Sequence, residues 1–275
     1  MFRFLSSFLI NPITKTILSV TAIVLVFLCL SIESPEIYGK YLRNKVGEKT
    51  YMIKGHPTKG GGGTGFAVQA PSGVSYIVTN SHVCEGVKGM TADKNSVYVV
   101  NNEGAMLRKI IVISDESDLC LIEGLPDVDG LKVSGSEPGL GEFVTVVGHP
   151  HLRPLSISRS EIVGVQDVEI LGYFMKSGNA VQDLLTQAED GKCDMPKNKI
   201  IEADVESFIG PMHLKICLII TKAAYMSTAV IYPGNSGSPV VNWVGRVIGV
   251  AFASDSTNWA YIVSLNDLND FLRRY

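Results

Sequence analysis

A short serine-containing turn is the segment of this sequence whose residue types most directly suggest chemistry. Residues 233–239, PGNSGSP, place Ser236 between two glycines and just before an apolar run. Gly, Asn, Ser and Pro all favour turns, so a tight turn between strands explains most of the segment. It does not explain a serine at the apex, whose hydroxyl becomes nucleophilic only when a base removes its proton. A catalytic interpretation therefore requires a histidine and a third group that orients it.

Five histidines could supply the base, and His82 has the most suitable context. It follows the apolar run SYIVTN, at the predicted junction of a strand and a turn, where a side chain can face a cleft. The other four lie in turn-like contexts beside Pro or Met: His56, His149, His151 and His213. Taken alone, each of the five histidines is more often structural or exposed than catalytic.

The group that orients the imidazole should be a partly buried carboxylate on a rigid element. Asp118 fits because it opens the strand-like run LCLIE, whereas the alternative, Asp115, lies in the preceding turn. An aspartate at a strand start is by itself only a turn cap. Its significance comes from the set, in which His82, Asp118 and Ser236 follow one another at intervals of 36 and 118 positions.

The elements that must position these residues are predicted to be short β-strands. Twelve apolar runs separated by turn residues, without alternating helices, are typical of an antiparallel sandwich or barrel. The one helix predicted beyond the N-terminal region is C-terminal, LNDLNDFLRRY, with a cap at Ser264 or Asn266 and arginines in its last turn. Residues 60–65, GGGGTG, lack the lysine of a phosphate-binding loop and predict a flexible segment that leads into the first strand. Residues 166–214 break the strand pattern and are interpreted as a long loop or insertion.

The motifs TNSHVC, SDLCLIE and GNSGSP occur in the His, Asp, Ser order of trypsin-like serine proteases, and the sequence resembles the HtrA-type branch of that family. The flanking segments GTGFAV, GEFVTVVGHP and VIGVAFAS are similar to that branch as well. The resemblance covers about residue 64 to the C-terminus, apart from the insertion at 166–214. It implies an all-β protease domain at residues 60–275, with two antiparallel six-stranded barrels, a C-terminal helix and the active site between the barrels.

The same resemblance implies a role for each candidate residue. Ser236 would attack the scissile carbonyl, His82 would take and return the proton, and Asp118 would fix the imidazole tautomer. The backbone amides of Gly234 and Ser236 would form an oxyanion hole, where a Cβ at position 234 would hinder the turn. Ser238 stands where the family usually has glycine. We expect this small residue to leave activity intact, and Ser238 is the alternative nucleophile.

A substrate pocket is also implied by the resemblance. Its floor and its wall strand are assigned to Val230, Phe252, Ala253 and Ser254. The floor lies six positions before the serine and carries no carboxylate, so Arg or Lys at the P1 position is disfavoured. We expect a modest preference for small or medium aliphatic P1 side chains. HtrA-type proteins commonly carry a PDZ domain after the protease, and none is expected here because the sequence ends soon after the last predicted helix.

An apolar run near the N-terminus predicts a membrane anchor. Residues 16–32, TILSVTAIVLVFLCLSI, form 17 uncharged residues, at the short end of what a spanning helix needs. We predict a tail and single-pass anchor at residues 1–32, a juxtamembrane stalk at 33–59 and a catalytic domain on the periplasmic or extracellular side. A cleaved signal peptide, a lipid-modified Cys29 and a buried core helix are the alternatives. Positive charges lie on both sides of the run, so the orientation depends on the short tail and on the acidic residues that follow.

Composition limits the possible partners. A chain of 275 residues with 46% hydrophobic and 19% charged residues is typical of a folded protein with one or two domains. A net charge of −3 and the absence of a Lys/Arg block exclude the electrostatic signature of nucleic-acid binding. No cofactor or metal site is predicted. Among the cysteines, Cys193 with Cys217 is the one disulfide suggested, whereas Cys84 and Cys120 have no obvious partners.

We therefore predict a membrane-anchored serine endopeptidase that acts on protein or peptide substrates. The main alternative is a catalytically silent protease-like module that binds unfolded or peptide segments in the same cleft. A structural membrane protein with a coincidental serine turn is the third hypothesis, and it leaves three motifs in one order unexplained. The complete set of three residue types favours the enzyme.

Overall fold

The computed structural model describes two units, which are considered separately. The described residues are 21, 35–91, 93–114, 116–171, 199–207, 210–254 and 259–275. The first unit, residues 1–44, contains nearly all of helix α2 (Pro35–Lys45), and the second unit, residues 45–275, contains everything else. In the part of the chain that the structure describes, no helix combines the length and the apolar character needed to cross a membrane. The predicted anchor at residues 16–32 lies outside the described residues except for Thr21.

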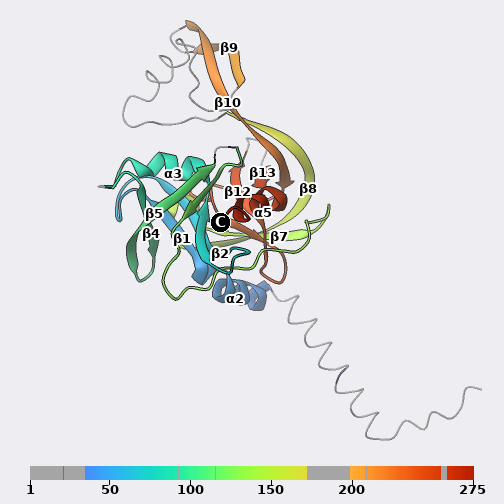
Figure 1. Ribbon diagram of the computed structural model, residues 1–275. Helices are drawn as coiled ribbons and strands as arrows, with labels where there is room; N and C mark the ends of the chain where they lie inside the picture. The colour runs from blue at the N-terminus through green and yellow to red at the C-terminus, as the bar shows by residue number, and fades with distance from the viewer. Residues whose placement is uncertain are drawn as a thin grey trace, which may run out of the picture. The chain divides into compact units, whose positions relative to one another are not determined.

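Six antiparallel strands close the first barrel in the order β1-β2-β3-β6-β5-β4 (Figure 1). Their bounds are β1 Thr50–Lys54, β2 Gly62–Gln69, β3 Ser75–Thr79, β4 Ser96–Asn101, β5 Gly104–Ser114 and β6 Leu119–Ile122. A single 3-10 turn, η1 (Gly47–Lys49), precedes β1. Strand β1 falls within residues 33–59, which the sequence analysis assigned to a stalk. The five residues TYMIK are too few to show a strand pattern, yet Tyr51 and Ile53 are buried in the barrel.

The second barrel also has six strands. Their bounds are β7 Phe143–Gly148, β8 Ser156–Leu171, β10 Gly210–Ser227, β11 Pro239–Val241, β12 Val247–Ser254 and β13 Ala260–Val263. They follow the order β13-β12-β11-β7-β8-β10, and β10 pairs back onto β13, which closes the ring. The predicted all-β fold with two antiparallel six-stranded barrels is confirmed.

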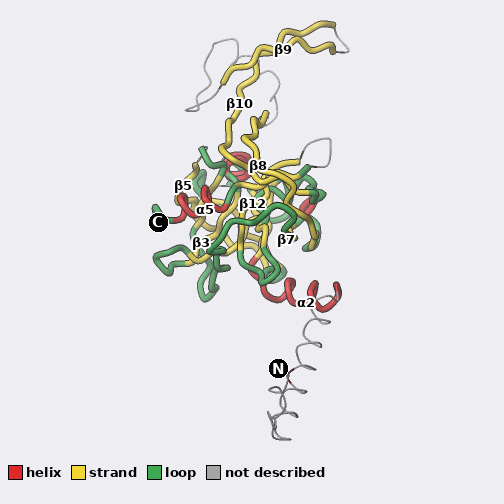
Figure 2. The backbone as a smooth tube through the Cα atoms, turned by 90° about the vertical axis from the view of Figure 1, so that its right-hand side faces the viewer, coloured by secondary structure: helices red, strands yellow, loops and turns green. Residues whose placement is uncertain are grey.

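Strands β8 and β10 continue beyond the second barrel as a ribbon. They have 16 and 18 residues, and β10 also pairs with β9 (Lys199–Ser207), the edge strand. In Figures 1 and 2 the outer part of β10 and β9 stand away from the barrel. The sequence analysis interpreted residues 166–214 as a loop or insertion. The described ends of that segment are paired strands instead, and residues 172–198 lie outside the described part.

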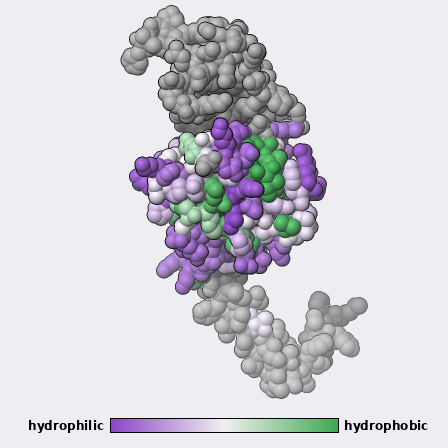
Figure 3. Space-filling view, turned by 60° about the vertical axis from the view of Figure 1, so that its left-hand side comes forward, coloured by the Kyte–Doolittle hydropathy of each residue, from purple (hydrophilic) through white to green (hydrophobic). Residues whose placement is uncertain are grey.

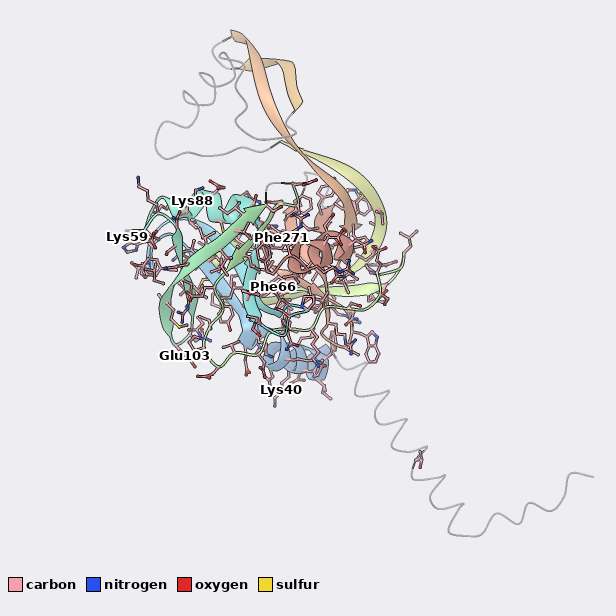
Figure 4. The ribbon with its side chains drawn as sticks, in the orientation of Figure 1. Lys40, Lys59, Phe66, Lys88, Glu103 and Phe271 are labelled. Carbon is pink, nitrogen blue, oxygen red and sulfur yellow. A yellow bond between two sulfur atoms is a disulfide. The ribbon has the colours of Figure 1, made fainter. Side chains whose placement is uncertain are left out.

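Each barrel encloses its own apolar core. The first core includes Tyr51, Ile53, Ile77, Val97, Val99 and Ile122, and the second includes Val144, Val146, Ile162, Val240, Ile248 and Ile262. Figure 4 shows Phe66 and Phe271 inside the molecule, whereas Lys59, Lys88 and Glu103 lie at its periphery. On the face drawn in Figure 3, hydrophilic residues cover most of the described surface and apolar residues form separate patches. The buried apolar residues of the strands therefore form two separate interiors, one in each barrel.

Two helices lie close to these cores. Helix α5 (Leu265–Leu272) confirms the predicted C-terminal helix, and the hydroxyl of its N-cap residue Ser264 accepts the Asp267 amide at 3.1 Å. Helix α3 (Ser81–Lys88) follows β3 directly, at a place where the sequence predicted the junction of a strand and a turn. The SHVCEGVK segment buries Val83, Cys84 and Val87 on one face of this helix. Such spacing is typical of an amphipathic helix, although a single pair of turns is too short to stand out in the sequence.

A disulfide joins Cys84 on α3 to Cys120 on β6. Both cysteines are fully buried in the first core. The sequence analysis found no partner for either one, because their 36-residue separation is closed by strand pairing and not by a local motif. Cys193 lies outside the described residues, so the suggested pairing of Cys193 with Cys217 stays a prediction.

Candidate active site

His82 and Asp118 are in direct contact in the first barrel. His82 is the second residue of α3, and Asp118 directly precedes β6. The imidazole Nδ1 lies 2.9 Å from Asp118 Oδ2 and 3.0 Å from Oδ1, and the His82 amide donates to Oδ1 at 3.1 Å. The His82 side chain is 36% exposed and that of Asp118 is 6% exposed. With Nδ1 bound to the carboxylate, Nε2 is the ring nitrogen left to accept a proton.

The start of helix α3 fixes the position of Asp118. Asn80, the N-cap residue, donates from its side-chain amide to the Asp118 carbonyl at 3.0 Å, and the Ser81 hydroxyl donates to Asp118 Oδ1 at 3.1 Å. Asp118 has a φ of 50°, a left-handed conformation that Asp adopts more readily than most residues. The disulfide adds a covalent tie two residues beyond each member of the pair. Local hydrogen bonds and one cross-link therefore hold the two side chains in register.

The carboxylate determines the protonation of His82. Partial burial by itself lowers the pKa of His82, but the Asp118 charge and its hydrogen bond to the ring outweigh that effect. The pKa of His82 is therefore raised above its ordinary value of 6.5. A base with this environment gains stabilisation once it has accepted a proton.

The serine turn of the second barrel is seated on the first barrel beside the histidine. The Thr64 amide on β2 donates to the Ser236 carbonyl at 2.8 Å. A Cβ built on Gly63 would lie 2.6 Å from the Ser236 carbonyl oxygen and also 2.6 Å from Val83 Cγ2. The Ser236 carbonyl and Val83, the residue that follows His82, therefore both pack against Gly63 of β2. This places the three sequence-predicted side chains in one region between the barrels.

Two backbone amides of the turn have no hydrogen-bond acceptor among the residues that the structure describes. The carbonyl oxygens of residues 233–236 all accept hydrogen bonds: Pro233 from the His151 amide at 2.5 Å, Gly234 from Thr64 Oγ1 at 2.7 Å, Asn235 from the Ser238 amide at 2.9 Å and Ser236 from the Thr64 amide at 2.8 Å. The amides of Gly234 and Ser236 donate to no other described residue. Gly234 has a φ of 94°, a conformation that L side chains rarely adopt. Two unpaired N–H groups next to a serine can bind a negatively charged oxygen.

The Ser236 hydroxyl has a different partner in this structure. Its Oγ donates to the Phe252 carbonyl on β12 at 3.2 Å, and it makes no hydrogen bond to His82. Rotation about the Cα–Cβ bond of Ser236 is the change that would redirect the hydroxyl. Staggered side-chain rotamers of an accessible serine interconvert on a picosecond to nanosecond timescale.

Of the four residues assigned to the substrate pocket, Val230 and Phe252 have described side chains, and the assignment of all four stays a prediction. Val230 is 46% exposed and borders a cavity of about 100 Å³, which Gly148 of β7 and Ser158 of β8 also line. Phe252 is 3% exposed and its ring packs against Tyr261 at 6.2 Å. Ala253 and Ser254 follow Phe252 on β12.

Ser238 occupies a buried site next to β7. Its side chain is fully buried, and its Oγ has no hydrogen-bond partner among the described residues. A Cβ built on Gly148 would lie 1.9 Å from that Oγ. The space for the unusual serine is therefore supplied by a glycine on the neighbouring strand.

Sequence reasoning missed the residues that support the turn. His149 and His151 were assigned to turn-like contexts, but the His151 ring packs 5.2 Å from that of Tyr232, three residues before the Asn-Ser pair. His149 is buried, which lowers its pKa, and its Nδ1 lies 2.9 Å from the Arg153 carbonyl. Thr64 was missed as well, although the pattern GTG at the start of a strand was visible. Among the described residues there is no cluster of three metal-ligating side chains.

Comparison with known proteins agrees with this geometry. The family model described as "Trypsin-like peptidase domain" matches residues 63–250. A probable periplasmic serine endoprotease, DegP-like, of Chlamydia pneumoniae is 28% identical over 210 residues, which cover 73% of this chain and 30% of that protein. The serine protease Do-like HtrA of Bacillus subtilis (strain 168) is 25% identical over 200 residues, 70% of this chain and 33% of that protein. The chain thus spans about a third of the length of these curated relatives.

Solved structures show the same fold. The Rv3671c protease of M. tuberculosis in its inactive form superimposes with a TM-score of 0.57 at 16% identity, covering 88% of this chain and 95% of that chain. The serine endoprotease from Yersinia pestis gives a TM-score of 0.52 at 14% identity, covering 86% of this chain and 66% of that chain. At these identities the likeness concerns the architecture of the two barrels.

The contrast between the pKa values of His82 and His149 can be measured by NMR titration. We expect a pKa above 6.5 for His82 and below 6.5 for His149, and we expect Asp118→Asn to lower the pKa of His82 alone. Because the folded-state pKa of His82 is raised, the pair stabilises the fold fully below pH 6.5, and this contribution is lost as the pH rises through the folded-state pKa. An unchanged His82 pKa in Asp118→Asn would contradict the assigned cause.

The contact between Ser238 and Gly148 predicts coupled stability effects. Gly148→Ala should lower the free energy of unfolding by about 1–3 kcal/mol, because the new methyl group overlaps Ser238 Oγ. In a Ser238→Gly background the cost should be smaller, although Asn235 Oδ1 would still lie 2.9 Å from the new methyl group. Denaturant titration of the four proteins of this cycle gives the coupling energy. Strictly additive costs would show that the two residues do not compete for space.

Proposed function

Because the chain belongs to the trypsin-like peptidase domain family, we propose that it is a serine endopeptidase that cleaves peptide bonds through an acyl-enzyme. Ser236 is the nucleophile, His82 the general base and acid, and Asp118 the group that orients the imidazole. The observation that carries the proposal is the attachment of the serine turn to β2, which contacts both Ser236 and Val83 in the helix of His82. A serine turn that served only as a strand connection would not need this attachment.

In the proposed reaction, the Ser236 hydroxyl first turns from the Phe252 carbonyl toward His82 Nε2. As Ser236 Oγ bonds to the substrate carbonyl carbon, its proton moves to Nε2, and the Asp118 carboxylate stabilises the resulting imidazolium. The imidazolium then protonates the leaving amine, the C–N bond breaks, and the acyl group stays on Ser236. A water molecule, deprotonated by the now neutral His82, hydrolyses the ester and restores the hydroxyl. The raised pKa of His82 has the direction that this proton acceptance requires.

The unpaired amides of Gly234 and Ser236 receive the negative oxygen of the tetrahedral intermediate in this mechanism. Both amides are already held by the peptide planes of the turn, so little reorganisation accompanies the reaction. Loss of one donor of this kind typically lowers kcat by about 10²–10³, or roughly 2.7–4 kcal/mol. The backbone geometry therefore contributes on the same scale as the acid–base residues.

We further propose protein or peptide substrates with small or medium aliphatic P1 side chains. Support comes from the uncharged floor residue Val230 and from the absence of any carboxylate among the described residues that line its cavity. A methylene group changes selectivity by only about 1–3 kcal/mol, so the preference would be graded.

Cleavage of a peptide library by the wild type and Ser236→Ala tests activity, nucleophile and preference together. We expect Ser236→Ala to lose at least about 10³-fold in kcat/KM and to lose labelling by a fluorophosphonate. Ser238→Ala is the matched control, and it should keep both the labelling and the cleavage pattern. No adduct on the wild type would favour the alternative, a silent module that binds peptide segments. Labelling that is lost in Ser238→Ala and kept in Ser236→Ala would instead identify Ser238 as the nucleophile.

We also propose that residues 16–32 anchor the chain in a membrane and that the protease domain lies on the exported side. The buried Cys84–Cys120 disulfide supports this location, since disulfides persist mainly in oxidising compartments. The Chlamydia pneumoniae relative is itself named as probably periplasmic. Acid quenching of intact cells, followed by alkylation in denaturant and mass spectrometry of the membrane fraction, should find both cysteines oxidised. Recovery of free thiols at both positions, or of the protein in the soluble fraction, would contradict the proposal.

A further inference from the structure

We propose that Thr64 is a positioning residue, whose buried hydroxyl holds the serine turn so that the Gly234 and Ser236 amides face the developing oxyanion. This inference rests on the proposed function. Thr64 is the third residue of β2 and is fully buried. Its hydroxyl donates to the Gly234 carbonyl at 2.7 Å and accepts the His149 amide at 3.0 Å. One side chain thus joins the first barrel to two segments of the second.

Each polar group of Thr64 has a defined partner. Its amide donates to the Ser236 carbonyl at 2.8 Å, and its carbonyl accepts the Thr79 hydroxyl at 2.6 Å. A hydroxyl has one proton and two lone pairs, so donation to Gly234 leaves a lone pair for His149. The bond pattern therefore fixes the direction of the hydroxyl as well as its position.

The hydroxyl and the amide of Thr64 determine the direction of the Ser236 N–H. A trans peptide is planar, with its C=O and N–H groups pointing in opposite directions. Thr64 anchors the carbonyls of Gly234 and Ser236, which belong to the two peptide planes on either side of the 235–236 peptide. The Ser236 N–H belongs to that central peptide. Its direction is therefore set by two planes that are both bound to one residue.

The Gly234 N–H depends on Thr64 through the loop after β7, residues 149–152. Its peptide carries the Pro233 carbonyl, which accepts the His151 amide at 2.5 Å. A Cβ built on Gly234 would lie 2.6 Å from the His149 carbonyl oxygen, so the loop packs directly on the turn. The same loop is bound to Thr64 through the His149 amide.

This loop needs outside support because its backbone is strained. His151 and Leu152 both have a φ of 54°, within the 3-10 turn η2 (Pro150–Leu152). Non-glycine residues in this region cost on the order of 1–3 kcal/mol each and persist only when surrounding contacts hold them. Without the Thr64 hydroxyl, the His149 amide and the Gly234 carbonyl lose their partners together. The serine turn and the 149–152 loop, which together orient the two oxyanion amides, would then both lose their hydrogen bonds to the Thr64 side chain.

Replacement of the hydroxyl by an isosteric methyl group tests the proposal. Thr64→Val should lower kcat by about 10–10³-fold and leave KM within about threefold, because the oxyanion develops only in the transition state. Thr64→Ser, which keeps the hydroxyl, should restore kcat to within about threefold of the wild type. Thr91→Val is the matched control. It removes a buried hydroxyl whose acceptors, the carbonyls of Lys88, Asp93 and Ser96, all lie outside the serine turn, and it should leave kcat within about twofold.

Two results would overturn the proposal: a wild-type kcat in Thr64→Val, or a loss in Thr64→Ser as large as that in Thr64→Val. If Thr64→Val does not fold, Thr64→Ala also lacks the hydroxyl and carries the same expectation. Amide hydrogen exchange at His149, followed by NMR, separates this inference from the proposed function. Exchange should accelerate at least about tenfold in Thr64→Val and stay near the wild-type rate in Thr64→Ser. A wild type without turnover would refute the protease proposal, while an unchanged His149 exchange rate in Thr64→Val would refute the role of Thr64.

Discussion

The attachment of the serine turn to strand β2 is the interaction on which the rest of this site depends. The turn belongs to the second barrel and the His82–Asp118 pair to the first, so neither barrel holds a complete set of groups. Hydrogen bonds from Thr64 to the carbonyls of Gly234 and Ser236 close the gap at 2.7 and 2.8 Å. Strand β2 pairs with β3, and β3 leads directly into the helix of His82. The position of β2 therefore determines the distance between the nucleophile and its base.

Sequence patterns identified the parts that depend on local chemistry. The serine in a glycine-rich turn, the histidine after an apolar run and the aspartate before a strand are signals carried by a few adjacent residues. The capped C-terminal helix is a signal of the same kind. Three features were missed because each depends on contacts between distant segments. They are strand β1, the Cys84–Cys120 bond and the support that Thr64 gives to the turn. Single-sequence reasoning has no measure of which distant segments meet.

Ser238 shows how a departure from the family pattern can be accommodated without moving the backbone. The family pattern that the sequence resembles implies glycine at this position of the turn. This chain has a buried hydroxyl there, and the neighbouring strand has a glycine at position 148. The missing Cβ on β7 provides the volume that the added side chain occupies. The hydroxyl still lacks a hydrogen-bond partner among the described residues, and burial of such a group usually costs about 1–3 kcal/mol. The serine and the glycine together keep the packing of the turn against β7, but they leave one buried hydroxyl without a hydrogen bond in the described structure.

The cross-link between α3 and β6 determines how the protein can respond to reducing agents. Neither sulfur is reachable from solvent, since Cys84 and Cys120 are both fully buried in the first core. Thiol–disulfide exchange requires a thiolate to approach one sulfur along the S–S axis. A reductant can therefore react only while the barrel is open, and the rate of reduction is limited by how often the barrel opens. In this molecule the rate at which the disulfide is reduced therefore reports local unfolding of the first barrel.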